Sequence, residues 1–400
     1  MHYPPGPAEF PGVALQAPGM AVASPRGSAP PSSFSERGRG SMADSSISKP
    51  RYQGLAATRR WEHQPVRPRA EFSLAVGDRV GELTIIGHLA RGRLTELYQV
   101  WSNEHWCALT GKLIAPEYLD AGGVPRSFRR EQRALASLHH PNIVRLFGSG
   151  EAAARPYLLL EYLAGPSLFD VLQSMPKRRL HVPDAVRAAM HVGAAVHYLH
   201  RRGFIYRDLK PANILLREGI PILVDFDVVR PLNRRRPADR LGTAPYMAPE
   251  QILREPLTPA TDVYGMGALL YELVTGRWPT EEPLDGGDEW DEDEWLATDE
   301  GAAALPAPSP ASGTQRRLDT AELEARYPQL TQPPVSPRQH NAQLPHLLER
   351  IILRCLAHDA RARFQTMSGL LAALAPLLKG QHRLWPAAAP IERRGDVLSR

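Results

Sequence analysis

The residues best suited to chemistry lie in two short segments near the middle of the chain. Asp208 precedes Asn213 by five residues, in a loop between an expected helix and the short strand 214–216. A carboxylate in such a loop can orient a hydroxyl nucleophile, and the amide oxygen of Asn213 can reach a metal ion. Asp225 follows Asn213 by twelve residues, at the end of the apolar strand 222–224. A carboxylate that emerges from a buried strand suits a magnesium ion that bridges polyphosphate oxygens.

The elements that must position these residues change in kind along the chain. Short β-like runs come first, at 82–86, 94–100, 106–114, 142–147 and 157–161, with one helical stretch at 128–138. Apolar residues then recur at spacings of three and four, which predicts helices at 185–201, 261–275, 345–356 and 368–378. Strands followed by helices predict a small sheet-rich lobe joined to a larger helical lobe, an α+β architecture.

The order and spacing of these segments resemble the eukaryotic-like (Hanks-type) Ser/Thr protein kinase family, over about residues 77–378. The shared features are a Gly-rich loop, a strand lysine, a helix glutamate, a catalytic loop, a metal-binding Asp-Phe motif and an Ala-Pro-Glu segment. The resemblance implies the two-lobed protein kinase fold, with a small antiparallel β-sheet N-lobe that carries one helix and a larger, mainly helical C-lobe. The segment 344–374 looks most like bacterial members of the family.

The resemblance also implies a role for each matching residue. Asp208 would be the catalytic base, Lys210 would neutralise the γ-phosphate of ATP, and Asn213 and Asp225 would hold magnesium or manganese. Lys112 matches the strand lysine that positions the α- and β-phosphates. The other residues implied to bind or position ATP are the helix glutamate Glu131, the loop residues Leu89, Gly92 and Leu97, and Glu161 and Leu163 of the segment between the lobes.

Three further positions are implied to be structural. Glu250 of the Ala-Pro-Glu segment should form a buried ion pair with Arg363, and Asp262 should anchor the backbone of the catalytic loop. The pairing of Lys210 with Thr243 resembles Ser/Thr-specific members of the family. The implied function is therefore an ATP-dependent Ser/Thr kinase that transfers the γ-phosphate of ATP to Ser or Thr hydroxyls of protein substrates.

Control by phosphorylation of the central loop is not expected. Residues 228–242 contain no Ser, Thr or Tyr, and Thr243 is the only possible acceptor before Tyr246. The position of Thr243 predicts contact with the catalytic residues instead. We therefore expect activity without a loop phosphate, with Asp239 facing Arg207.

Four positions depart from the common family pattern: Ala90, Thr95, Tyr206 and Asp227. Asp227 is the most serious, because it replaces a glycine that lets the metal-binding carboxylate move. The alternative reading is a pseudokinase, a nucleotide-binding scaffold or regulatory module. A nucleic-acid binder, suggested by the net charge of +5, is disfavoured because no aromatic residues are interleaved with the basic ones.

Composition sets the expected organisation. We expect a disordered arm rich in Pro, Gly, Ser and Arg at 1–73, an N-lobe at 74–161, a C-lobe at 162–378 and a tail at 379–400, with a flexible acidic and Pro-rich insertion at about 281–340. No apolar run reaches the ~20 residues of a membrane span. The N-terminus lacks a secretion signal, and two cysteines cannot form a disulfide framework, so a reducing cytoplasm is expected.

Overall fold

The computed structural model describes residues 72–92, 94–120, 124–152, 154–232, 240–280 and 320–378. The predictions for the arm up to residue 71, for 281–319 and for the tail lie outside these residues, as does the prediction for Asp239.

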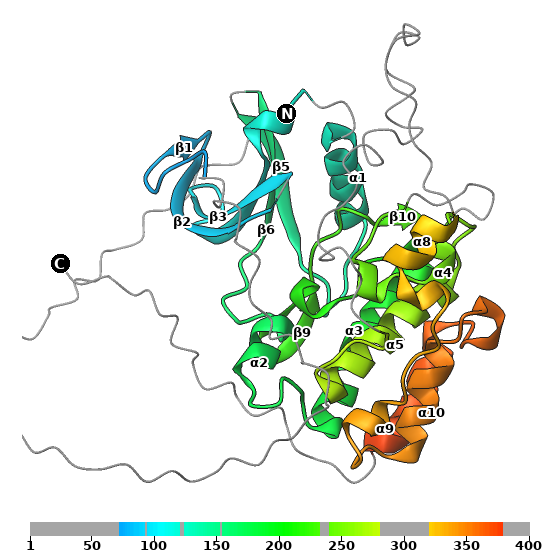
Figure 1. Cartoon of the computed structure of the whole chain (residues 1–400). Helices are drawn as coiled ribbons and strands as arrows, with labels where there is room; N and C mark the ends of the chain where they lie inside the picture. The colour runs from blue at the N-terminus through cyan, green and yellow to red at the C-terminus, as the bar shows by residue number, and fades with distance from the viewer. Residues whose placement is uncertain are drawn as a thin grey trace, which may run out of the picture. The chain divides into compact units, whose positions relative to one another are not determined.

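Six strands form one antiparallel sheet in the order β1-β2-β3-β4-β6-β5 (Figure 1). Their bounds are β1 Arg79–Val80, β2 Leu83–Arg91, β3 Thr95–Ser102, β4 Cys107–Ile114, β5 Leu146–Ala152 and β6 Arg155–Glu161. Every second residue of β3 is buried, from Glu96 to Ser102. This period of two arises because successive side chains of a strand point to opposite faces of the sheet.

The two faces of the sheet pack differently. Leu159 belongs to a small core on one face, whereas its neighbours Leu158 and Leu160 belong to the main core of the molecule. Helix α1 (Val124–Ala136) packs on the main-core side through Val124 and Phe128. The sheet therefore places β4 and α1, which carry Lys112 and Glu131, next to each other.

The rest of the chain is mainly helical. The helices are α2 Leu168–Ser174, α3 Val182–Arg201, α4 Pro249–Ile252, α5 Pro259–Thr275, α8 Thr320–Arg326, α9 Pro337–His340, α10 His346–Cys355 and α11 Met367–Leu374. Two strand pairs accompany them: β7 (Phe204–Ile205) with β10 (Arg230–Pro231), and β8 (Ile214–Arg217) with β9 (Ile220–Leu223). These short strands hold the loops that carry Asp208 and Asp225.

Helix α5 is the centre of the helical lobe and lies beside α3 and α10 (Figure 1). Helix α11 also packs on it. Nearly all of its residues are buried. Its start is marked by a capping box between Thr258 and Thr261 and by Pro259 in the first turn, and its end by Gly276 at φ +72°. These signals agree with the preferences of helix ends. The buried helix can therefore serve as a rigid base for the loops around it.

One strand of the sheet differs from its predicted position. The strand expected at 142–147 begins at Leu146 and runs to Ala152. Ile143 instead forms an isolated parallel bridge with Leu223 of β9. The Asn142 side chain also donates to the Pro221 carbonyl at 2.9 Å. Tertiary contacts with β9 therefore decide the conformation of residues 142–144, which local alternation cannot foresee.

Two boundaries also differ from the prediction. Residues 320–340, expected to be part of a flexible insertion, contain α8 and α9. Leu323 of α8 and Tyr327, which directly follows that helix, pack there against Met247 and Ile252. At the other end, Ser73 was assigned to the disordered arm, yet its backbone N–H donates to the buried Glu96 carboxylate at 3.0 Å.

Candidate active site

The loop that carries Asp208 is held in place by Asp262 of α5. The Asp262 carboxylate accepts from the backbone N–H of Tyr206 at 2.9 Å and from that of Arg207 at 2.8 Å. His200 Nε2 lies 2.7 Å from the same carboxylate, which is 1% exposed. Two backbone donors directed at one buried carboxylate fix the loop, including Arg207 at φ +79°. The predicted anchoring role of Asp262 is confirmed.

Both carboxylate oxygens of Asp208 are held by hydrogen bonds. Oδ2 accepts from Asn213 Nδ2 at 2.8 Å, and Oδ1 accepts from the Thr243 hydroxyl at 2.7 Å and the Thr243 backbone N–H at 3.0 Å. Lys210 Nζ lies 3.1 Å from Asp208 Oδ2 and donates to Thr243 Oγ1 at 2.7 Å. The predicted contact of Thr243 with both catalytic-loop residues is confirmed. The result is an oriented carboxylate beside a single ammonium group.

Lys112 on β4 meets the carboxylates of three residues. Its Nζ is 2.9 Å from both Glu131 oxygens, 3.1 Å from Asp225 Oδ1 and 2.5 Å from Asp227 Oδ1. The lysine and Glu131 are 4% and 1% exposed, whereas Asp225 and Asp227 are 42% and 38% exposed. The predicted Lys112–Glu131 pair is therefore present. The contact between Lys112 and Asp227 was not foreseen.

The charges of this group shift each other's pKa values. Burial by itself lowers the pKa of Lys112, but the surrounding carboxylates outweigh it and raise that pKa well above its ordinary value. Partial burial, together with Glu131, raises the pKa of Asp227 to about 7. The pKa of Asp225 is also raised, by burial and then by Asp227, with a smaller contribution from Asp208. Lys112 therefore stays charged throughout the physiological range, and Asp208 is close enough to Asp225 to affect its ionisation.

Helix α1 is joined to the segment after β9 by two more hydrogen bonds. Glu131 Oε1 accepts from the Phe226 backbone N–H at 3.2 Å, and the Ser127 hydroxyl donates to the Asp227 carbonyl at 3.0 Å. Phe226 packs edge-to-face against Tyr206, at 5.5 Å between ring centroids. The sequence contained no signal for Ser127, because a serine in a helix is usually solvated.

The loop between β2 and β3 lies beside the lysine. Leu97 is the cross-strand partner of Lys112, and the Gly92 backbone N–H donates to the Thr95 carbonyl at 2.9 Å. A bulge between His88 and Ala90 interrupts the pairing at Leu89. The structure thus places Leu97 and Gly92 in the hairpin that approaches Lys112, as expected for a phosphate-covering loop.

The segment between the lobes follows β6. Leu163 is 8% exposed and belongs to the main core. The Glu161 backbone N–H donates to the Arg145 carbonyl at 2.9 Å, and its side chain pairs with Arg217 at 2.8 Å. An adenine contact from Glu161 must therefore use its carbonyl oxygen.

The donor set at the site fits a hard divalent cation. Because Asn213 Nδ2 donates to Asp208, the amide oxygen of Asn213 is the atom left for a metal ion. Carboxylate oxygens of Glu131, Asp225 and Asp227 lie within 4.8 Å of one another. Oxygen-only donors of this kind suit Mg²⁺ and Mn²⁺.

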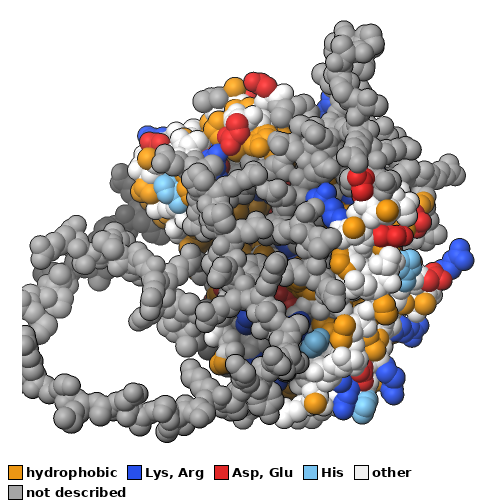
Figure 2. Space-filling model, viewed as in Figure 1, with side chains coloured by type: hydrophobic (Ala, Val, Ile, Leu, Met, Phe, Trp, Pro, Cys, Tyr) orange, Lys and Arg blue, Asp and Glu red, His pale blue; other side chains and the backbone are white. Residues whose placement is uncertain are grey.

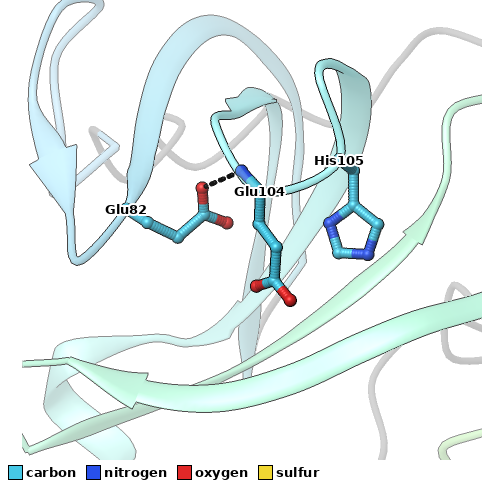
Figure 3. Close-up of side chains that lie close together, drawn as sticks. All are labelled: Glu82, Glu104 and His105. Atoms are coloured by element: carbon cyan, nitrogen blue, oxygen red, sulfur yellow. Dashed lines mark hydrogen bonds between the residues drawn. The ribbon is translucent and has the colours of Figure 1, made fainter. Parts of the chain in front are cut away.

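A second group of possible ligands lies at the turn between β3 and β4, formed by Glu82, Glu104 and His105 (Figure 3). The Glu82 carboxylate accepts from the Ser102 hydroxyl at 2.9 Å and from the backbone N–H groups of Asn103 and Glu104 at 2.6 and 3.1 Å. These bonds give the carboxylate a structural role in closing the turn. We therefore assign no metal site to this group.

The Ala-Pro-Glu segment is fixed by an ion pair inside the helical lobe. Arg363 donates to both oxygens of Glu250, at 2.7 and 2.9 Å, and is itself 1% exposed. Thr261 of α5 donates to the same carboxylate at 2.9 Å. The predicted buried pair is confirmed.

The fold and the arranged residues agree with one family. A family model described as the protein kinase domain matches residues 83–370. Because this match covers most of the chain, the chain belongs to the protein kinase family. The predicted resemblance to Hanks-type Ser/Thr kinases is thereby confirmed.

Similar proteins are mainly bacterial kinases. A probable serine/threonine-protein kinase of Streptomyces coelicolor is 33% identical over 201 residues, which are 48% of this chain and 30% of that protein. The serine/threonine-protein kinase PknB of Mycolicibacterium smegmatis is 30% identical over 268 residues, 64% of this chain and 36% of the relative. An Aurora kinase of the yeast Yarrowia lipolytica is 34% identical over 198 residues, 49% of this chain and 52% of that protein. The chain thus spans about a third to a half of the length of these relatives.

Solved structures support the fold. The kinase domain of Mycobacterium tuberculosis PknI matches with a TM-score of 0.54 and 20% identity, over 76% of this chain and 99% of that structure. At this identity the match establishes the two-lobed fold alone. Among the helices in the described part of the chain, none has the length and apolar character needed to span a bilayer.

Proposed function

We propose that this chain is an ATP-dependent Ser/Thr protein kinase. The observation that carries the proposal is the simultaneous presence of two arrangements: Lys112 paired with Glu131 of α1, and Asp208 held by Asn213 and Thr243. Phosphoryl transfer depends mainly on positioning and charge stabilisation, and these arrangements supply both.

Asp208 would accept the proton of the substrate hydroxyl. Its two oxygens are fixed, so the carboxylate presents a defined direction to that hydroxyl as its oxygen attacks the γ-phosphorus of ATP. Lys210, 3.1 Å from Asp208, would stabilise the charge of the γ-phosphate. The proton moves to Asp208, and ADP leaves with the electrons of the broken bond.

Lys112 would bind the α- and β-phosphates, with Glu131 holding its ammonium in place. Leu89, Gly92 and Leu97 would cover the nucleotide from the β2–β3 side. The Glu161 carbonyl and the Leu163 backbone would bind adenine. Asn213 and Asp225 would hold Mg²⁺ or Mn²⁺, which neutralises phosphate charge when bound.

Protein substrates with Ser or Thr acceptors follow from the contact of Lys210 with Thr243 and from the names of the relatives. Among the described side chains visible in Figure 2, Lys and Arg are interspersed with Asp and Glu. Both cysteines are free in the structure, which suits the proposed reducing cytoplasm.

The test is phosphate transfer by the purified full chain, with Mg-ATP or Mn-ATP and a generic basic protein. Transfer should occur on Ser or Thr. Asp208→Asn and Lys112→Ala should each lower kcat by about 100-fold or more. Asp120→Asn and Lys177→Ala are matched controls, because both residues are exposed and neither belongs to the proposed site.

Two results would contradict the proposal. Equal transfer by wild type, Asp208→Asn and Lys112→Ala would show that the assigned roles are wrong. ATP binding without turnover under any metal would favour the pseudokinase alternative.

A further inference from the structure

Asp227 is a third carboxylate on a lysine that has one acidic partner on its neighbouring helix. Its Oδ1 lies 2.5 Å from Lys112 Nζ, closer than either oxygen of Glu131 at 2.9 Å. Glycine at this position would offer no such contact. The ammonium group has three hydrogens, and four carboxylate oxygens surround it.

The backbone of residue 227 is tied to α1, because the Asp227 carbonyl accepts from the Ser127 hydroxyl. Two residues earlier, Asp225 lies at φ +59°, a conformation that needs support from its surroundings. Asp225 and Asp227 are the exposed members of the group, whereas Lys112 and Glu131 are almost completely buried. The two aspartates therefore lie on the side from which a nucleotide would approach the lysine.

The charges are unbalanced. One ammonium group faces three carboxylates, so at full ionisation the group carries a net charge of about −2. The triphosphate of ATP is also strongly negative, and in a partly buried site its repulsion from two exposed carboxylates is poorly screened. Without a cation, ATP would have to displace both aspartates from Lys112.

We propose that Asp227 is a positioning residue that makes nucleotide binding conditional on a divalent cation. In the absence of the cation, Asp227 occupies Lys112 and repels the phosphates. Asp225 and Asp227 can turn to a divalent cation, because carboxylate oxygens are its preferred ligands, and Lys112 is then left for the phosphates. This inference rests on the proposed function, since it deepens the binding of ATP at the same site.

The test compares ATP binding with and without metal in the full chain. Titration calorimetry with ATP at pH 8 is performed once in EDTA and once in saturating Mg²⁺. Asp227→Asn keeps the size of the side chain and removes its charge, and Asp227→Gly restores the usual family residue. Asp120→Asn, an exposed aspartate, is the matched control.

In EDTA, Asp227→Asn and Asp227→Gly should bind ATP about tenfold more tightly than wild type, a shift expected from removing one charge near the lysine. In Mg²⁺ the three proteins should agree within about threefold, because the cation neutralises the carboxylates. A purely structural role for Asp227 would instead change both conditions equally.

The inference fails if the ratio of the EDTA and Mg²⁺ dissociation constants is the same in wild type and Asp227→Asn. Failure of the proposed function has a different signature. If no protein, wild type included, binds ATP even in Mg²⁺, the kinase proposal and this inference are both overturned.

Discussion

At the scale of single residues, the choice of lysine over arginine at position 112 matters. Only five of the 48 basic residues of the chain are lysines, and Lys112 and Lys210 are two of them. A compact ammonium group can contact four oxygens of three carboxylates, as Lys112 does, whereas the planar guanidinium of arginine has a fixed donor geometry. Lys210 likewise contacts both Asp208 and Thr243, so both lysines lie where a compact ammonium group reaches several oxygens.

Thr243 links the proposed catalytic base Asp208 to the end of the central loop, residues 228–242. Thr243→Ala removes the hydroxyl bonds to Asp208 and Lys210, and we expect kcat to fall about 10- to 100-fold with little change in KM for ATP. Thr243→Ser keeps the hydroxyl and should retain most of the activity. Steady-state kinetics on both variants checks this. Equal losses in the two variants would show that the methyl group, and not the hydroxyl, is what matters.

The same geometry argues against activation by a phosphate on Thr243. The hydroxyl is already used as donor and acceptor within the site, and Arg207 donates to the carbonyls of Val228 at 3.3 Å and Leu241 at 3.4 Å. These bonds join the two ends of the central loop, residues 228–242, without a phosphate. Phosphatase treatment should therefore leave the activity unchanged, and a loss that maps to Thr243 would contradict this.

The buried ion pair between Glu250 and Arg363 should contribute to the stability of the fold. Glu250→Ala leaves the Arg363 guanidinium buried without its carboxylate partner, so we expect the free energy of unfolding to fall by about 3–5 kcal/mol. Chemical denaturation measures the change. Glu255→Ala, at an exposed glutamate just after α4, should change it by less than about 0.5 kcal/mol. Similar changes in both variants would show that the ion pair is unimportant.

At the scale of elements, the central helix α5 is connected to the segment after Thr243. Tyr246 donates to the Glu272 carboxylate of α5 at 2.5 Å, and Trp278 donates to the Tyr246 oxygen at 3.4 Å. Burial raises the pKa of Glu272 to about 7, although Tyr246 and Arg178 oppose the shift. The position of this segment is thereby coupled to a group that titrates near neutral pH.

The coupling predicts a pH dependence of stability. Between pH 4.5 and about 7, the folded protein keeps a proton on Glu272 that the unfolded chain releases. The free energy of unfolding should therefore fall as pH rises through this window, by roughly 1–3 kcal/mol after solvent screening. In Glu272→Gln, which cannot ionise, denaturation midpoints should vary less between pH 5 and 8. An unchanged slope, or an equal effect of the exposed Glu324→Gln, would contradict this.

Local signals predicted most elements but could not decide where some of them pack. The alternation in β3 and the caps of α5 are local, so both elements were foreseen. The paired conformation of Ile143 depends on Leu223, 80 residues away, and the packing of Leu323 depends on Met247. Contacts between distant segments produce no periodic pattern in the sequence. The strand predicted to begin at residue 142 and the flexible insertion predicted to extend to about residue 340 were wrong for this reason.

At the scale of the whole molecule, the domain begins before the residue that composition suggested. Phe72 stacks on His88 at 4.4 Å between ring centroids, and the Ser73 hydroxyl donates to Glu96 at 2.6 Å and accepts from Arg155 at 2.7 Å. Glu96 is fully buried, so these bonds replace the water that the carboxylate has lost. Residues 72–73 therefore belong to the folded N-lobe.

Two truncations test this boundary. Removal of residues up to 70 should leave the melting temperature within about 2 °C of the full chain, because it retains the contacts of Phe72 and Ser73. Removal up to residue 76 breaks the bonds of Ser73 to Glu96 and should cost about 1–3 kcal/mol, or several °C. Differential scanning calorimetry on both proteins gives the comparison. Equal melting temperatures would place the boundary after residue 76.

The sequence by itself determined the family, the two-lobed α+β plan and the positions of Lys112, Glu131, Asp208 and Asn213, because their spacing along the chain is a family pattern. Their roles in ATP binding and transfer remain proposals for experiment. Only the tertiary structure decided that Asp227 lies against Lys112. That contact joins residues 115 positions apart, from two lobes whose approach is set by packing. The spacing of residues along the sequence indicates the candidate groups, whereas their charges and distances in the folded molecule determine which of them interact.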